Sequence, residues 1–169
     1  MLKRKDLLGL IDASASEITE ILDLAQEFKN RIRKGEKKMS YLDGKTATIL
    51  FYENSTRTRT SFEQAAKYLG ATCINIAAGT SSVAKGETLV DTGKTLDAQK
   101  NDFIIMRHNM GGAPYLLAKT VKASVLNAGD GINEHPTQAL LDMLTMRETF
   151  GSLKGLKVAI LGDIKHSRV

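Results

Sequence analysis

The sequence predicts an α/β fold in which a parallel sheet is covered by helices on both faces. Short apolar segments alternate with longer amphipathic segments along most of the chain. The apolar segments are rich in β-branched residues and nearly free of charge, as strands buried on both faces are. This alternation is typical of parallel strands that are joined by crossover helices.

The first two elements are a helix over residues 16–34 and a strand over residues 46–52. In the helical segment, apolar side chains recur at spacings of three and four. Ser14 and Glu17 fit a capping box ahead of the helix, and Gly35 ends it. The segment 46–52 is a continuous apolar and β-branched run, which favours a fully buried strand.

The same order of elements repeats through the middle of the chain. A helix over residues 58–69 stops at Gly70, a suitable C-terminal cap. A strand over residues 72–76 follows it. The next pair is a helix over residues 87–99 and a strand over residues 102–107.

Four further elements complete the pattern. Residues 114–119 form a short helix and residues 123–127 a strand. Pro136 suits the first position of a helix that reaches residue 149. A last strand is expected over residues 157–162.

The length and composition limit the possible classes of protein. We expect one domain over residues 1–150 and the beginning of a second over residues 151–169. No apolar run approaches the ~20 residues of a membrane helix. A single cysteine, Cys73, excludes an internal disulfide framework and fits a reducing compartment, so a cytoplasmic location is expected.

The net charge of +5 does not indicate nucleic-acid binding. Residues 29–38 contain six basic groups and one acidic group, so they account for the whole excess. The rest of the chain is neutral and offers no basic face that could follow a phosphate backbone. A solvated helix end followed by a loop is the favoured interpretation.

The segment after the first strand, residues 53–60, has the chemistry of a phosphate site. It combines hydroxyl groups and arginines with the start of a helix, where backbone N–H groups are available. The alternative is a polar helix start with Ser55 or Thr58 as N-cap. Arg57 and Arg59 lie about 200° apart on a helix, so we assign Arg57 to the phosphate and Arg59 to a supporting salt bridge.

Two histidines follow later strands. His108 comes directly after Arg107, and His135 precedes Pro136 and Gln138. Imidazole can donate to a carbonyl oxygen, and an amide both donates and accepts. Either histidine could instead be a loop residue with its hydrogen bonds satisfied. No metal-ligand spacing links the histidines and the cysteine, and no nucleotide-binding glycine motif occurs.

Four segments resemble the transcarbamoylase family. Residues 55–59 are similar to its phosphate motif and residues 135–138 to its carbamoyl-binding motif. Residues 81–88 resemble the mobile loop of its aspartate carbamoyltransferase branch, and residues 162–169 resemble the opening of that branch's aspartate domain. Ornithine carbamoyltransferases fit the last two segments poorly.

The resemblance implies the carbamoyl-phosphate domain of the transcarbamoylase fold, with roles for named residues. Arg57, Thr58, Arg107 and His135 are implied to be catalytic. Ser81 and Lys85 would reach a neighbouring subunit's site, Lys85 and Arg168 would bind aspartate, and Glu53 would brace the closed domains. The implied carbamoyl phosphate-binding residues are Ser55, Thr56, Arg57, Thr58, Arg107, His135 and Gln138.

The implied reaction transfers the carbamoyl group of carbamoyl phosphate to L-aspartate, giving N-carbamoyl-L-aspartate and phosphate in de novo pyrimidine biosynthesis. It requires no metal or organic cofactor. The resemblance implies a homotrimer and leaves open whether regulatory chains join it. The alternatives are an ornithine-type transcarbamoylase and a carbamoyl phosphate-binding module without turnover. We expect the 169-residue chain alone to be inactive, because the rest of the aspartate domain would follow Val169.

Overall fold

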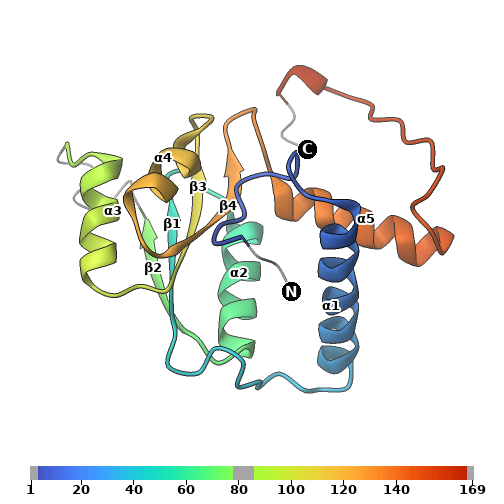
Figure 1. Cartoon of the computed structure of the whole chain (residues 1–169), viewed down its shortest axis with the longest axis horizontal. Coiled ribbons are helices and arrows are strands. Elements are labelled where there is room, and N and C mark those ends of the chain that lie inside the picture. The colour runs from blue at the N-terminus through green and yellow to red at the C-terminus, as the bar shows by residue number, and fades with distance from the viewer. Residues whose placement is uncertain (1–3, 78–85, 167–169) are drawn as a thin grey trace.

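The computed structural model describes residues 4–77 and 86–166, which form a parallel four-stranded sheet with helices on both sides (Figure 1). The strand order is β2-β1-β3-β4, and each neighbouring pair is parallel. The strands are β1 (Thr46–Phe51), β2 (Thr72–Ala77), β3 (Phe103–His108) and β4 (Ser124–Asp130). The helices are α1 (Ala15–Arg33), α2 (Thr56–Tyr68), α3 (Leu89–Ala98), α4 (Ala113–Thr120) and α5 (Pro136–Phe150), followed by a 3-10 turn at Ile164–His166.

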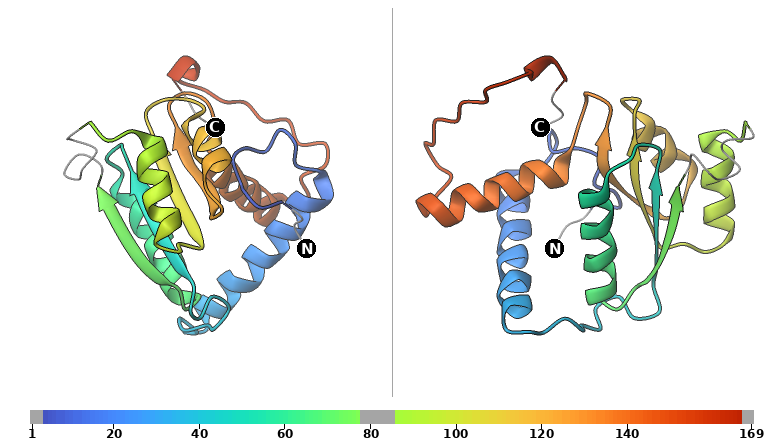
Figure 2. Two further views of the ribbon diagram at one scale, coloured as in Figure 1. Left: turned by 60° about the vertical axis from the view of Figure 1, so that its left-hand side comes forward. Right: turned by 180° about the vertical axis from the view of Figure 1, so that it is seen from behind.

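The predicted two-sided covering of the sheet is confirmed. Helices α2 and α5 lie on one side and α3 and α4 on the other, while α1 packs against α5 farther from the sheet (Figures 1 and 2). Among the helices of the described residues, none combines the length and apolar character needed to cross a membrane.

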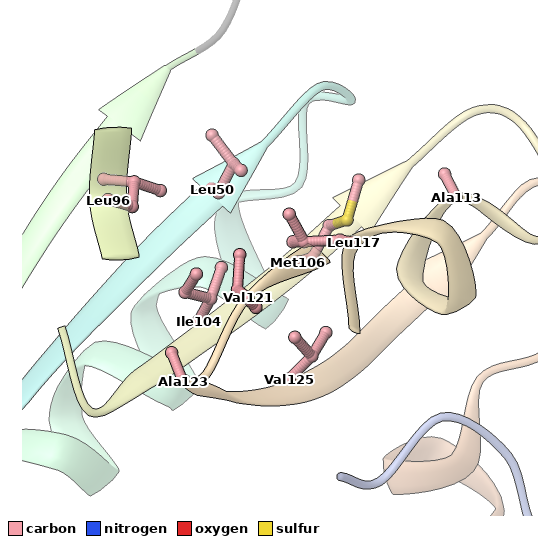
Figure 3. Close-up of a cluster of buried hydrophobic side chains, with 9 residues drawn as sticks. All are labelled: Leu50, Leu96, Ile104, Met106, Ala113, Leu117, Val121, Ala123 and Val125. Atoms are coloured by element: carbon pink, nitrogen blue, oxygen red, sulfur yellow. The ribbon is translucent and has the colours of Figure 1, made fainter. Parts of the chain in front are cut away.

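The core consists of two apolar clusters, one on each face of the sheet. Successive side chains of a strand point to opposite faces. In β1, Leu50 therefore packs on the side of α3 and α4, whereas Ile49 and Phe51 pack on the side of α2. The first cluster is Leu50, Leu96, Ile104, Met106, Ala113, Leu117, Val121, Ala123 and Val125 (Figure 3).

Local signals fix several helix ends. The N–H of Glu17 donates to Ser14 Oγ (3.2 Å), and the N–H of Ser14 donates to the Glu17 carboxylate (2.9 Å), which forms the predicted capping box. After α2, Gly70 has a φ of +94°, and a Cβ at this position would lie 2.9 Å from the carbonyl oxygen of Met39. Glycine is therefore required there.

The basic segment 29–38 forms ion pairs within the chain. Lys29 Nζ lies 2.6 Å from the Glu148 carboxylate, and Arg31 pairs with Glu36. These are contacts of a solvated helix end.

The strand predicted over residues 157–162 is wrong. This segment is irregular chain, and the 3-10 turn follows it. A strand is held by hydrogen bonds to a neighbouring strand, and the described part of the chain places none beside it. Its apolar side chains are accordingly exposed, with Val158 at 62%, Ile160 at 59% and Leu161 at 94%. The domain boundary expected near residue 150 stays a prediction.

The strand order creates a switch point between β1 and β3. From β1 the chain moves outward to β2, and from β3 it moves outward to β4 on the opposite side. In open α/β sheets, ligands bind in the crevice at the carboxyl ends of the strands on either side of such a point.

Candidate active site

The turn from β1 into α2 presents a helix N-terminus at this crevice. Ser55 is the N-cap residue, in extended backbone with φ −154° and ψ 98°, and its hydroxyl makes no capping hydrogen bond. The first turn of α2 contains Arg57 and no acidic residue. Because the first N–H groups of a helix have no intrahelical acceptors, this turn offers donors and positive charge to an anion.

Arg107 lies beside this turn because β3 pairs directly with β1. Its register partner is Phe51, and its carbonyl oxygen accepts a hydrogen bond from the N–H of Tyr52 (2.9 Å). The Arg107 side chain is 13% exposed. It donates from Nε to the Glu53 carboxylate (3.0 Å) and from Nη1 to the carbonyl oxygen of Ala128 (3.2 Å). These two bonds orient the guanidinium group at the crevice.

The opposite side of the crevice is formed by the start of α5. His135 is the N-cap residue, and its side chain does not cap the helix. Thr137 Oγ1 lies 3.5 Å from His135 Nδ1. Gln138 Nε2 donates to Asp142 Oδ1 (3.0 Å), which leaves the amide oxygen of Gln138 as an acceptor.

A pocket of about 570 Å³ opens between these elements. Six of the seven residues predicted to bind carbamoyl phosphate line it. The seventh, Thr56, lines an adjoining hollow of about 260 Å³ together with Glu53 and Arg59. The residues that line the larger pocket are Ser55, Arg57, Thr58, Ser61, Arg107, His135, Gln138 and Leu141.

His108 does not line the pocket. Its Nδ1 accepts a hydrogen bond from the N–H of Met110 (2.9 Å), and its ring lies against Tyr52 with the ring centroids 4.5 Å apart. Burial lowers the pKa of the His108 imidazole below its ordinary value, although nearby carboxylates oppose this. His108 is thus the last residue of β3 and not a loop residue, and its Nδ1 has a backbone partner, whereas His135 lies in the pocket wall.

Several predicted roles have no structural counterpart. Ser81, Lys85 and Arg168 lie outside the described residues, so their roles stay predictions. Arg59 forms no salt bridge among the residues that the structure describes. It acts at longer range on Glu63, whose carboxyl pKa is lowered mainly by a hydrogen bond from Lys67 and also by the charge of Arg59.

Sequence reasoning missed Ser61 and Leu141. Each lies about one helical turn beyond a predicted residue, Ser61 after Arg57 and Leu141 after Gln138. Residues three and four apart share a helix face, so counting forward from the two motifs would have found both.

This arrangement can bind a phosphate group next to a carbonyl group. Arg57 and the α2 N-terminus suit phosphate oxygens. Arg107 and His135 can donate to a carbonyl oxygen on which negative charge develops, and the amide oxygen of Gln138 can accept from an NH₂ group. Within residues 4–77 and 86–166, no group of three or more His, Cys, Asp or Glu side chains is placed to hold a metal ion.

A family model agrees with this description. The model for the aspartate/ornithine carbamoyltransferase carbamoyl-P binding domain matches residues 5–148. All residues that line the pocket fall within the matched range.

Curated relatives match almost the whole chain. The aspartate carbamoyltransferase catalytic subunit of Ruminiclostridium cellulolyticum is 65% identical over 168 residues, which cover 99% of this chain and 54% of the relative. The corresponding subunit of Acetivibrio thermocellus is 63% identical over 169 residues, covering 100% of this chain and 54% of the relative. The chain thus spans about half the length of the curated relatives it matches.

Solved structures are similar over the same extent. One is aspartate transcarbamoylase from Trypanosoma cruzi in complex with carbamoyl phosphate and aspartate, with a TM-score of 0.91 and 39% identity, covering 96% of this chain and 51% of that chain. The ligand-free form of the T. cruzi enzyme has a TM-score of 0.87 and 37% identity, covering 96% of this chain and 52% of that chain.

Proposed function

Because this chain belongs to the aspartate/ornithine carbamoyltransferase family, we propose that its pocket binds carbamoyl phosphate for transfer of the carbamoyl group to L-aspartate. The products are N-carbamoyl-L-aspartate and phosphate, in a step of de novo pyrimidine biosynthesis. The supporting observation is the placement of Arg57, Arg107, His135 and Gln138 around one pocket at the switch point of the sheet.

The phosphate group of the substrate lies at the start of α2 in this proposal. Arg57 binds its oxygens through charge-assisted hydrogen bonds, and the hydroxyls of Ser55, Thr56 and Thr58 add donors. The backbone N–H groups of the first helical turn complete the anion site. The first turn of α2 has no acidic side chain that would repel an anion.

The carbamoyl group lies toward β3 and α5. The amine of aspartate attacks the carbonyl carbon, and the electron pair of the C=O double bond moves onto oxygen. Arg107 and His135 donate hydrogen bonds to this oxygen, with His135 as a neutral imidazole. The C=O bond re-forms as phosphate leaves with the electron pair of the bond between its oxygen and the carbonyl carbon, and the departing phosphate takes up the proton that the attacking nitrogen loses. The amide oxygen of Gln138 accepts from the carbamoyl NH₂ group and so fixes its direction.

The remaining roles rest on the family resemblance. Residues 151–169 begin an aspartate domain, in which Arg168 binds a substrate carboxylate. Ser81 and Lys85 enter the site of a neighbouring subunit in a homotrimer, where Lys85 also binds aspartate. Glu53, which pairs with Arg107 here, braces the closed domains. The presence of one cysteine supports a cytoplasmic location.

Calorimetry with the 169-residue chain tests substrate binding, and a product assay tests turnover. We expect saturable binding of carbamoyl phosphate, competition by inorganic phosphate, and no N-carbamoyl-L-aspartate from this chain alone. A longer chain with the second domain should form product from aspartate and not from ornithine.

The possible failures of this test are distinguishable. A folded chain without saturable carbamoyl phosphate binding would refute the proposal. Turnover with ornithine would favour the ornithine-type alternative. Binding without turnover by the longer chain would favour a binding module.

A further inference from the structure

Two polar side chains of β4, Asn127 and Asp130, are fully buried. Both are 0% exposed, and neither lines the pocket. A buried polar group is costly unless hydrogen bonds satisfy it. The partners of these two side chains therefore show which parts of the chain they hold together.

The carboxylate of Asp130 accepts four hydrogen bonds. Its Oδ2 accepts from the N–H of Gly112 (2.7 Å) and from Asn133 Nδ2 (3.0 Å). Its Oδ1 accepts from the N–H of Glu134 (3.0 Å) and from Asn127 Nδ2 (2.9 Å). One side chain thereby joins the loop before α4 to the loop before α5.

Both backbone polar groups of Glu134 are bonded to Asp130. The N–H of Glu134 donates to the carboxylate, and its carbonyl oxygen accepts from the backbone N–H of Asp130 (3.1 Å). The next residue is His135, the N-cap of α5, with φ −142° and ψ 71°. The position of the imidazole therefore depends on where Asp130 holds Glu134.

Close packing restricts the loop between β4 and α5 at Gly131. Gly131 has a φ of +60°, and a Cβ there would lie 2.7 Å from the carbonyl oxygen of Asn109. Its N–H donates to the carbonyl oxygen of His108 (2.8 Å). Within β4, two residues before Asp130, the carbonyl oxygen of Ala128 accepts from Arg107 Nη1 (3.2 Å).

We propose that Asp130 is a positioning residue for the carbonyl-binding side of the pocket and acts through Glu134 on His135. The inference rests on the proposed function, because it assigns His135 to the carbamoyl group. The phosphate-binding groups lie on α2, which none of the hydrogen bonds of the Asp130 side chain reaches. Loss of Asp130 should therefore impair recognition of the carbamoyl group more than recognition of phosphate.

The test compares Asp130→Asn with Asp102→Asn. In Asp130→Asn the side chain keeps its shape, but one acceptor oxygen becomes an NH₂ group. Whichever way the amide turns, one pair of donors loses its acceptor. Asp102 is the matched control because its oxygens accept from Lys45 Nζ (2.9 Å) and the N–H of Thr46 (2.9 Å) at the amino ends of the strands, away from the pocket.

The first measurement is the ratio of affinities for carbamoyl phosphate and inorganic phosphate, by calorimetry. Asp130→Asn should lower this ratio ~3- to 10-fold, the effect of one hydrogen bond, and Asp102→Asn should leave it unchanged. His135→Ala should lower it by a similar factor, and the double variant should lose no more. An unchanged ratio in folded Asp130→Asn, or additive losses in the double variant, overturns the proposal.

The second measurement needs no ligand, so it separates failure of this inference from failure of the proposed function. The imidazole NMR signals of His135, assigned by their loss in His135→Ala, should shift in Asp130→Asn and not in Asp102→Asn. Unshifted signals overturn the inference. Shifted signals in a chain that binds no carbamoyl phosphate refute the proposed function and support the positioning of His135.

A milder variant covers the case in which Asp130→Asn does not fold. Asn133→Ala removes only the bond from Asn133 Nδ2 to Asp130 (3.0 Å). It should shift the His135 signals in the same direction by a smaller amount. The absence of any shift overturns the proposal.

Discussion

Replacing Arg57 by alanine should remove most of the affinity for phosphate, whereas Arg59→Ala should retain it. Both arginines belong to the first part of α2, two residues apart. Arg57 lines the larger pocket and Arg59 the adjoining hollow. Because each substitution removes one positive charge, the two variants differ in direct contact with the ligand and not in net charge.

The size of the effect follows from the kind of contact. A hydrogen bond to a charged group contributes about 1.5–3 kcal/mol, so Arg57→Ala should weaken phosphate binding by about 10- to 150-fold. The charge of Arg59 acts on the ligand through solvent, which screens it. Arg59→Ala should therefore weaken binding by less than about threefold.

Calorimetric titration of both variants with inorganic phosphate and carbamoyl phosphate measures this difference. Circular dichroism during thermal unfolding serves as the control for folding. Binding by Arg57→Ala as tight as by the wild type, or equal losses in the two variants, would refute the assignment of Arg57 to the phosphate.

Three further predictions concern other parts of the chain. In a longer chain with both domains, His135→Ala should lower turnover by ~10²–10³, the usual loss for one oxyanion donor; an unchanged turnover number would remove His135 from the mechanism. Burial lowers the pKa of folded His108 from 6.5, so the unfolded state takes up a proton first as pH falls. The resulting contribution to stability is complete above pH 6.5 and is lost as pH falls through the lower folded pKa. Unfolding free energies between pH 8 and pH 5 should thus fall more for the wild type than for His108→Gln, and parallel curves would contradict this. Finally, longer Lys85→Ala and Arg57→Ala chains, each nearly inactive, should regain part of the activity when dissociated and reassembled together. If hybrid trimers form without regaining activity, Lys85 does not act in a neighbour's site.

The described fold could be predicted well wherever local chemistry decides the conformation. The Ser14 and Glu17 capping box and the glycine after α2 depend on residues close in sequence, and both were predictable. The four paired strands were predictable because strands buried on both faces have continuous apolar runs. The segment 157–162 has the same pattern, but pairing requires a neighbouring strand, and the pattern does not reveal whether one is present.

The residues of the candidate site also differ in whether the local sequence could predict them. Ser55, Arg57 and His135 were predictable because they follow strands and begin helices. Asp130 was not predictable, because its complete burial and its hydrogen bond from the N–H of Gly112 arise only in the folded chain, although Glu134 is close in sequence. An acidic residue between two glycines is typical of a turn. The neighbouring sequence does not indicate whether such a residue lies in an exposed turn or is a buried carboxylate that accepts from four donors.

The strand order also bears on how the site forms during folding. The turn from β1 into α2, which contains Arg57, follows β1, whereas His135 follows β4. Strand β3 separates β1 from β4 in the sheet. Contacts between residues so far apart in sequence require closure of long loops, which is slow and costs chain entropy. A partly folded chain that has lost only β4 would keep Arg57 on its helix but would have no imidazole opposite it. Ligand binding then adds stability to the completely assembled sheet, so carbamoyl phosphate would raise the free energy of global unfolding and of any partial unfolding that removes β4, and would leave fraying of elements away from the pocket nearly unchanged.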